Sequence, residues 1–175
     1  MVLHNGLRGY PEGTAFPSGP STGDKFLRTD IEGGTLCFYD GTRWLELAIE
    51  EISMSAGVAV PVTINGAPSR WVPHVQENVW LMDWTGLYYV STTNDGSNYW
   101  TVQLLEKTGA ATNVLDAHDS SGESADTNIR WARTIDAVVD FASTYDWLQI
   151  RVLKTASPGD MAFIHNTLRF RRIHT

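Results

Sequence analysis

Apolar and polar residues alternate along much of this chain, with the two-residue period that is typical of β-strands. The alternation is densest at residues 35–49, TLCFYDGTRWLELAI, where Asp40-Gly41 separates two apolar runs. Asp-Gly between such runs predicts a β-hairpin, because glycine adopts positive φ without a steric penalty and aspartate tolerates it better than most residues. With Asp40 and Gly41 as the two turn residues, Cys37 would lie opposite Trp44.

In this register one face of the hairpin carries Leu36, Phe38, Leu45 and Leu47, and Arg43 lies over the Phe38 ring. A three-residue loop with a bulge would shift the register by one residue and exchange the two faces. Residues 25–31 also alternate and are followed by the turn signal Glu32-Gly33-Gly34. We therefore expect a three-stranded meander over 25–31, 35–39 and 43–49, which is too small to be stable without a partner surface.

The first 23 residues predict an extended arm. Eight of them are glycine or proline, which excludes a helix or a long strand ladder through this segment. Apolar side chains recur along the arm at Leu3, Leu7, Tyr10 and Phe16, as expected of a segment that lies along another surface. The alternative is a mobile terminus.

The remainder of the chain predicts a second, larger β unit. Strand patterns occur at 60–64, 69–73, 79–84, 87–93, 99–107, 129–141, 145–155 and 161–173. Thr85-Gly86 is interpreted as a turn and 110–128 as a long polar loop. The spacing of 129–141 could also fit an amphipathic helix, but its β-branched and aromatic residues favour strand.

This pattern indicates an all-β fold whose larger unit is an antiparallel β-sandwich of the jelly-roll kind. The expected organisation is an extended arm (1–23), a small three-stranded β module (24–49), a linker (50–59) and a sandwich head (60–175).

Composition excludes several classes of function. The net charge is −7 and the pI is about 5.1, which argues against a protein that binds nucleic acid by neutralising phosphates. Arg169, Arg171 and Arg172 are expected to face solvent on a terminal strand. Cys37 is the only cysteine, so no internal disulfide can form, and we interpret it as a small buried side chain.

No apolar run is long enough to span a bilayer, so no membrane partner is expected. The N-terminus also lacks the basic start and apolar core of a secretory signal, which predicts synthesis in the cytoplasm.

No motif for catalysis or for a cofactor is present, and none of the five histidines has a metal-ligand spacing. The acidic run 116–126, with Asp116, Asp119, Glu123 and Asp126, resembles loops that hold Ca²⁺, but such runs are usually only solvated. We therefore predict no metal, no cofactor and no catalytic residue.

Seven tryptophans suggest two alternatives: sugar-stacking platforms, or aromatic side chains that fill the core and subunit interfaces. The first place to look for a glycan-binding platform is the turn 93–98, with the candidates Asn94, Asp95, Tyr99 and Trp100.

Two runs resemble a module of structural proteins from tailed bacteriophages: residues 20–30, PSTGDKFLRTD, and residues 38–45, FYDGTRWL. The later runs TNDGSNYWTVQL (93–104), TASPGD (155–160) and LRFRRI (168–173) are similar to jelly-roll heads of the same group. The resemblance implies a virion location, as a capsid decoration (cement) protein or as the head of a fibre.

We therefore expect a non-enzymatic virion protein that binds other virion proteins and forms a homotrimer. Its expected docking residues are Leu3, Leu7, Tyr10 and Phe16 of the arm with Phe38, Tyr39 and Trp44 of the hairpin. The rival hypothesis is a carbohydrate-binding module that recognises a host surface glycan.

Overall fold

The computed structural model describes residues 9–31, 33–57, 66–71, 78–91, 93–108, 111–125, 127–141 and 146–175. Every regular element within these ranges is a strand, which confirms the all-β fold class. The strands are β1 (Glu12–Gly13), β2 (Lys25–Arg28), β3 (Thr35–Tyr39), β4 (Trp44–Glu46), β5 (Glu50–Gly57), β6 (Gly66–Trp71), β7 (Asn78–Val90), β8 (Tyr99–Thr108), β9 (Ala111–Asp119), β10 (Thr127–Asp140), β11 (Trp147–Thr155) and β12 (Met161–His174).

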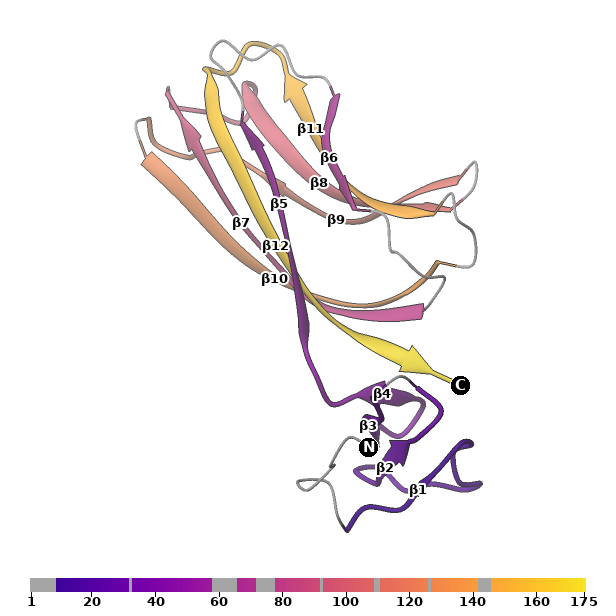
Figure 1. Ribbon diagram of the computed structural model, residues 1–175. Coiled ribbons are helices and arrows are strands. Elements are labelled where there is room, and N and C mark those ends of the chain that lie inside the picture. Colours follow the sequence, from indigo (N-terminus) through magenta and orange to yellow (C-terminus); the bar gives the residue numbers. More distant parts are fainter. Residues whose placement is uncertain are drawn as a thin grey trace.

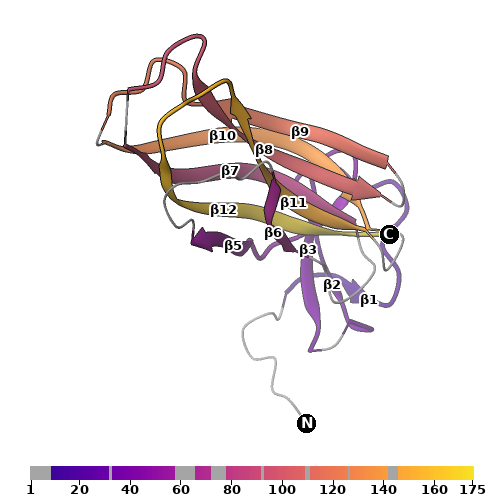
Figure 2. The same ribbon diagram turned by 90° about the horizontal axis from the view of Figure 1, so that it is seen from above.

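The larger unit is an antiparallel β-sandwich of two sheets (Figures 1 and 2). One layer has the strand order β5-β12-β7-β10 and the other the order β6-β11-β8-β9. The first strand of the unit therefore lies beside the last, and strands adjacent in sequence alternate between the sheets except at β8–β9. This is the jelly-roll arrangement that the pattern predicted.

The core lies between the two sheets. Successive side chains of a strand point to opposite faces, so alternate residues of β11, and of β12 from Ile164 to Phe170, are directed inward. Strands β7 and β8 follow the same alternation, interrupted between Leu81 and Trp84 and at Leu104-Leu105. Burial of each large apolar side chain contributes about 1.5–3 kcal/mol. The fully buried residues include Leu81, Trp84, Tyr88, Trp100, Leu104, Leu148, Ile150 and Leu168.

Strand β7 runs without a break through Thr85-Gly86, so the predicted turn is wrong. Both residues are paired on each side, Gly86 with Trp131 of β10 and with Asn166 of β12. A Cβ at position 86 would lie only 1.9 Å from Cζ2 of Trp131, so this glycine makes room for the indole ring. Gly86 therefore permits close packing rather than a change of chain direction.

The polar segment expected to be a loop at 110–128 contains strand β9, paired with β8. Strand β9 is at the edge of the second sheet and much of it is exposed, which explains why its sequence lacks clear apolar alternation. Residues 129–141 lie in strand β10 up to Asp140, which excludes the helical alternative.

The N-terminal module contains the predicted meander, β2-β3-β4, with β1 added parallel to β2. The module is not a separate sheet. Ile173 and His174 at the end of β12 pair with Leu45 and Trp44 of β4, so the meander continues the large sheet of the sandwich (Figure 1).

The hairpin register differs from both registers considered from the sequence. Tyr39 lies opposite Trp44, so residues 40–43 form a four-residue loop. The Asp40 carboxylate stabilises this loop by accepting hydrogen bonds from the backbone N–H groups of Thr42 (2.8 Å) and Arg43 (2.9 Å). Compared with the register of the two-residue turn, the strand pairing is shifted by two residues. An even shift leaves each side chain on its predicted face of the sheet.

Arg43 does not lie over Phe38. Its guanidinium lies 5.2 Å from the centre of the Trp80 ring, whereas Arg171 covers Phe38 at 5.1 Å. Aromatic rings of the module and of the head are therefore each covered by an arginine from the other unit.

The linker expected at 50–59 is largely a strand. Residues Glu50–Gly57 form β5, which pairs with β12, and Met54 is buried in the core of the sandwich. Residues 58 and 59 lie outside the described residues.

The three C-terminal arginines were expected to face solvent, but each of them also binds another group of the chain. Arg169 pairs with Asp83, and Arg172 pairs with Glu50. Arg171 donates hydrogen bonds to the carbonyl oxygens of Glu46 (2.8 Å) and Leu47 in the segment that leads from β4 to β5. The contacts of Arg171 connect the module to the head, whereas those of Arg169 and Arg172 lie within the sandwich.

Candidate binding surfaces

The N-terminal module has its own small aromatic core, to which the arm contributes. The Phe16 ring stacks on Trp44 with a centroid distance of 4.6 Å and an interplanar angle of 4°. Phe26, Cys37 and Trp44 form the buried cluster, and Phe16 and Tyr39 pack against it. This part of the arm therefore lies on the module.

Burial raises the pKa of the Cys37 thiol to about 12, so the thiol is neutral near pH 7. This agrees with its interpretation as a buried side chain.

The expected docking residues differ in accessibility. Tyr10 is 37% exposed and Phe38 is half-buried, whereas Trp44 is only 6% exposed and belongs to the module core. Leu3 and Leu7 lie outside the described residues. Of the expected surface, Tyr10 is thus the most accessible described member.

A groove of about 630 Å³ lies on the module between the arm and β2. Tyr10 is at this groove, and the Lys25 ammonium group lies 5.7 Å from the centre of its ring. The groove combines aromatic, proline and charged side chains, a mixture suited to a protein partner. Its lining residues are Tyr10, Pro11, Pro17, Gly23, Asp24, Lys25, Phe26 and Trp44.

The expected sugar platform at 93–100 is not formed by Trp100. Its side chain is only 1% exposed, and its indole N–H donates to the carbonyl oxygen of Gly159 (2.7 Å). Asn94 is also buried, and its amide donates to the hydroxyl of Ser120 (2.7 Å). Both side chains stabilise the end of the sandwich and are inaccessible to a ligand.

Asp95 and Tyr99 are more accessible than these two. The Asp95 carboxylate accepts hydrogen bonds from the backbone N–H groups of Ser97 and Asn98, which lower its pKa. Asp95 therefore holds the turn together, and Tyr99 is half-buried beside it.

The acidic run does not assemble a metal site in the described part of the chain, where no group of three His, Cys, Asp or Glu residues could hold an ion. Asp116 lies 3.8 Å from Arg133, and Asp119 accepts a hydrogen bond from the backbone N–H of Ser121. Asp126 is outside the described residues.

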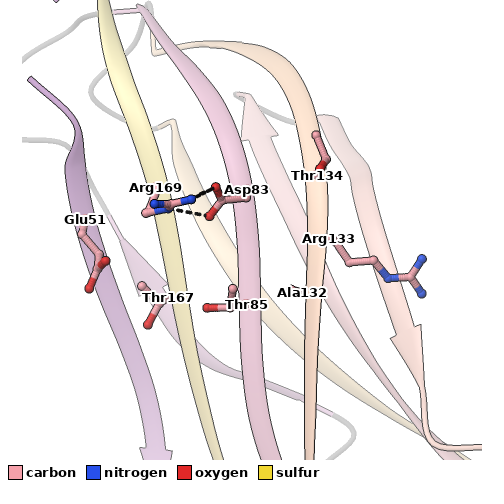
Figure 3. Close-up of a pocket in the computed structure, with 8 residues that line it drawn as sticks. All are labelled: Glu51, Asp83, Thr85, Ala132, Arg133, Thr134, Thr167 and Arg169. Atoms are coloured by element: carbon pink, nitrogen blue, oxygen red, sulfur yellow. Dashed lines mark hydrogen bonds and ion pairs between the residues drawn. The ribbon is translucent and has the colours of Figure 1, made fainter. Parts of the chain in front are cut away.

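A polar groove of about 430 Å³ crosses the outer face of the large sheet (Figure 3). Its lining residues come from β5, β12, β7 and β10, and the register arranges them in rows across the strands. Arg169 lies between Glu51 and Asp83, and Asp83 is opposite Thr134. In the next row Thr167, Thr85 and Ala132 are neighbours, so shorter side chains follow a row of longer ones.

The two central strands present a fixed ion pair at this groove. Arg169 Nε lies 2.9 Å from one Asp83 carboxylate oxygen, and Arg169 Nη2 lies 2.5 Å from the other. This hydrogen bonding raises the pKa of Arg169, so the guanidinium stays charged. Figure 3 shows Arg133 pointing away from the pair; its Nη2 donates to the carbonyl oxygen of Ala117 (3.4 Å).

Sequence reasoning missed this groove. The only signal was polar residues at alternate positions of 83–85 and 167–169, which any antiparallel sheet with a solvated face displays. The groove requires residues from four strands, and only the register between strands brings them together.

No protein-family model and no curated protein matches the chain. Among solved structures, the fold is similar to a xylan-binding module, CBM15, at 15% identity and a TM-score of 0.37, over 69% of this chain and 96% of that chain. It is also similar to a chain from infectious bursal disease virus, Gx strain, at 14% identity and a TM-score of 0.39, over 85% of this chain and 37% of that chain.

A third similar structure is the VP2 subviral particle of infectious bursal disease virus, at 12% identity and a TM-score of 0.33, over 90% of this chain and 41% of that chain. The chain thus spans about two fifths of these viral chains. Similarities this low are a matter of fold and carry no argument about ligands or partners.

Within the described part of the chain, no helix is long and apolar enough to cross a membrane.

Proposed function

We propose that the chain is a non-enzymatic structural protein of a virion, a capsid decoration protein or a fibre head, that binds other virion proteins through its N-terminal module. The observation that carries the proposal is the construction of this module. It bears the groove beside Tyr10, and strand β4 is joined to the end of β12. A partner bound at the groove would therefore hold the jelly roll in a defined orientation.

The two sequence runs that resemble tailed-phage structural proteins support the same proposal. Residues 20–30 supply β2 and part of the groove, and residues 38–45 supply the hairpin loop and Trp44. The resemblance therefore coincides with the proposed docking unit. Ordering an extended arm costs about 1–2 kcal/mol per residue, and the contact between Phe16 and Trp44 offsets part of this cost before any partner binds.

The test is to purify particles from cells that produce the chain and to identify it among the particle proteins by mass spectrometry. Tyr10→Glu places a negative charge at the docking groove and should reduce the amount of particle-bound chain at least tenfold. Val114→Glu is the matched control, because Val114 is an exposed apolar side chain on the edge strand β9, outside the module.

Absence of the unsubstituted chain from purified particles would contradict the virion proposal. Normal retention of the Tyr10→Glu chain would contradict docking through this groove. Both variants change exposed side chains, so circular dichroism should show a folded protein in each case.

A second candidate function is carbohydrate binding. The expected platform at Trp100 is buried and cannot hold a sugar. The observation that favours carbohydrate binding is instead the polar groove on the large sheet.

A further inference from the structure

The polar groove across β5, β12, β7 and β10 has the size of a small-ligand site. Its volume of about 430 Å³ is within the usual range of about 300–1,000 Å³ for ligand sites. Strands of a sheet lie about 4.8 Å apart, so a groove that crosses four of them is about 14 Å long. We infer that this groove binds a short, uncharged oligosaccharide laid across the strands.

The sheet itself excludes one common class of ligand. Strands β12 and β7 are central, and each pairs with a strand on both sides at this position. Their backbone groups are therefore already hydrogen-bonded, and an extended peptide cannot join the sheet here as an added strand. Recognition at the groove must use side chains.

The lining side chains also argue against apolar and highly charged ligands. Ala132 is the only apolar residue among the eight, so the groove offers no pocket for an aromatic or aliphatic anchor. Glu51 and Asp83 carry two negative charges and Arg169 one positive charge, whereas the Arg133 guanidinium is directed away, toward Ala117 and Asp116 of β9. A groove without net positive charge does not select a polyanion such as nucleic acid or a sulfated glycan.

The polar side chains of the groove can form hydrogen bonds with the hydroxyl groups of a sugar. Asp83 and Arg169 hold each other in place, so an incoming hydroxyl meets an acceptor and a donor that are already oriented. Thr85 and Thr167 lie side by side in the row of shorter side chains, and each hydroxyl can donate and accept (Figure 3). Glu51 is exposed at one end and adds a further acceptor.

This inference does not depend on attachment through the N-terminal module. The groove and the module groove share no residue, so each can be tested while the other stays intact.

The experiment uses the full chain with immobilised oligosaccharide probes. The uncharged probes are hexasaccharides of glucose, mannose, xylose and N-acetylglucosamine; the anionic probes are a heparin hexasaccharide and an oligomer of sialic acid. Binding to at least one uncharged probe is expected, and isothermal titration calorimetry then gives its Kd.

Thr85→Arg fills the groove with a long charged side chain and should weaken this binding at least tenfold. Thr101→Arg is the matched control, because Thr101 is also half-buried in a central strand of its sheet but belongs to the other sheet. Ala132→Arg, at an exposed position of β10, is a second variant that fills the groove if Thr85→Arg does not fold.

Loss of binding in the groove variants, with binding retained in Thr101→Arg, supports the assignment. Failure to bind any uncharged probe at millimolar concentration, or binding to anionic probes alone, overturns it. Unchanged affinity in a folded groove variant also overturns it.

Discussion

At the scale of single residues, Gly86 shows how tightly the core of the sandwich is packed. It has no Cβ, and three ring atoms of Trp131 occupy the space where one would be, at 1.9–2.3 Å. Trp131 in turn contacts Trp84 edge-on, with a centroid distance of 5.5 Å. The ring cannot move away without disturbing a second buried tryptophan.

We therefore expect Gly86→Ala to lower the free energy of unfolding by about 1–3 kcal/mol, the usual effect of overpacking a core. Urea denaturation would measure it. Gly96→Ala is the control, since a Cβ at position 96 meets no atom within 4 Å, and its change should be within about 0.5 kcal/mol. Equal stability of the two variants would contradict this account of the packing.

We predict that protonation of His118 makes the stability of the folded protein depend on pH. Its ring stacks on Trp131 at 4.6 Å, and burial together with the positive charge of Arg133 lowers its pKa below the usual value of 6.5, although Asp119 and Asp116 oppose the shift. The folded state therefore binds this proton less readily than the unfolded state does. By linkage, this contribution to stability is fully present above about pH 6.5 and is lost as the pH falls through the lower pKa of the folded state.

His118→Phe keeps an aromatic ring against Trp131 but cannot be protonated. The free energy of unfolding of this variant should fall less between pH 7 and pH 5 than that of the unsubstituted chain. Urea denaturation across this range would measure both slopes, and identical slopes would rule out His118 as the titrating group.

At the scale of elements, the last residues of β12 join the two units of the chain. Arg171 donates to the carbonyl oxygens of Glu46 and Leu47 and covers the Phe38 ring. Partial burial lowers the pKa of Arg171, but far too little for it to lose its charge near pH 7. Its hydrogen bonds hold the turn between β4 and β5 against the C-terminal strand.

Arg171→Met keeps the apolar part of the side chain and removes these hydrogen bonds. We expect a loss of about 2 kcal/mol in stability, as is usual for hydrogen bonds to a charged group. Hydrogen exchange should accelerate at the Leu47 amide, which donates to the carbonyl oxygen of Leu36 (2.9 Å), more than in the centre of β7. Arg130→Met, at an exposed position of β10, is the control; an equal loss there would argue against a specific role for Arg171.

At the scale of the whole molecule, apolar side chains remain exposed at the C-terminal end of the module. Leu47 is 42% exposed and Ile49 is 45% exposed, and both lie in the segment that connects β4 with β5. When another copy of the chain covers these apolar groups, their removal from water stabilises the associated state.

We expect the chain to form a trimer at micromolar concentration, which multi-angle light scattering would detect. Leu47→Glu should shift the population toward monomer, whereas Val114→Glu on the edge strand β9 should not. A monomeric unsubstituted chain would contradict a trimer in solution.

The N-terminal hairpin shows most clearly which features of the fold follow from the sequence. The pattern correctly assigned its strands and the face of each side chain, because alternation records which side of a sheet is buried. It did not predict the four-residue loop, since that depends on the Asp40 carboxylate accepting two backbone hydrogen bonds. Strand β9 was missed for a related reason: an exposed edge strand needs no apolar face.

Alternation in the sequence by itself determined that this protein is all-β, with a meander before a jelly-roll sandwich, because burial of one sheet face requires an apolar residue at every second position. Only the tertiary structure decided where ligands and partners can reach it. In the folded chain Trp100 is buried and Phe16 stacks on Trp44. Asp83 lies beside Arg169, although the two are 86 residues apart in the sequence. Such neighbours are set by the pairing of distant strands, and a periodicity of two along one strand contains no information about which strand lies beside it.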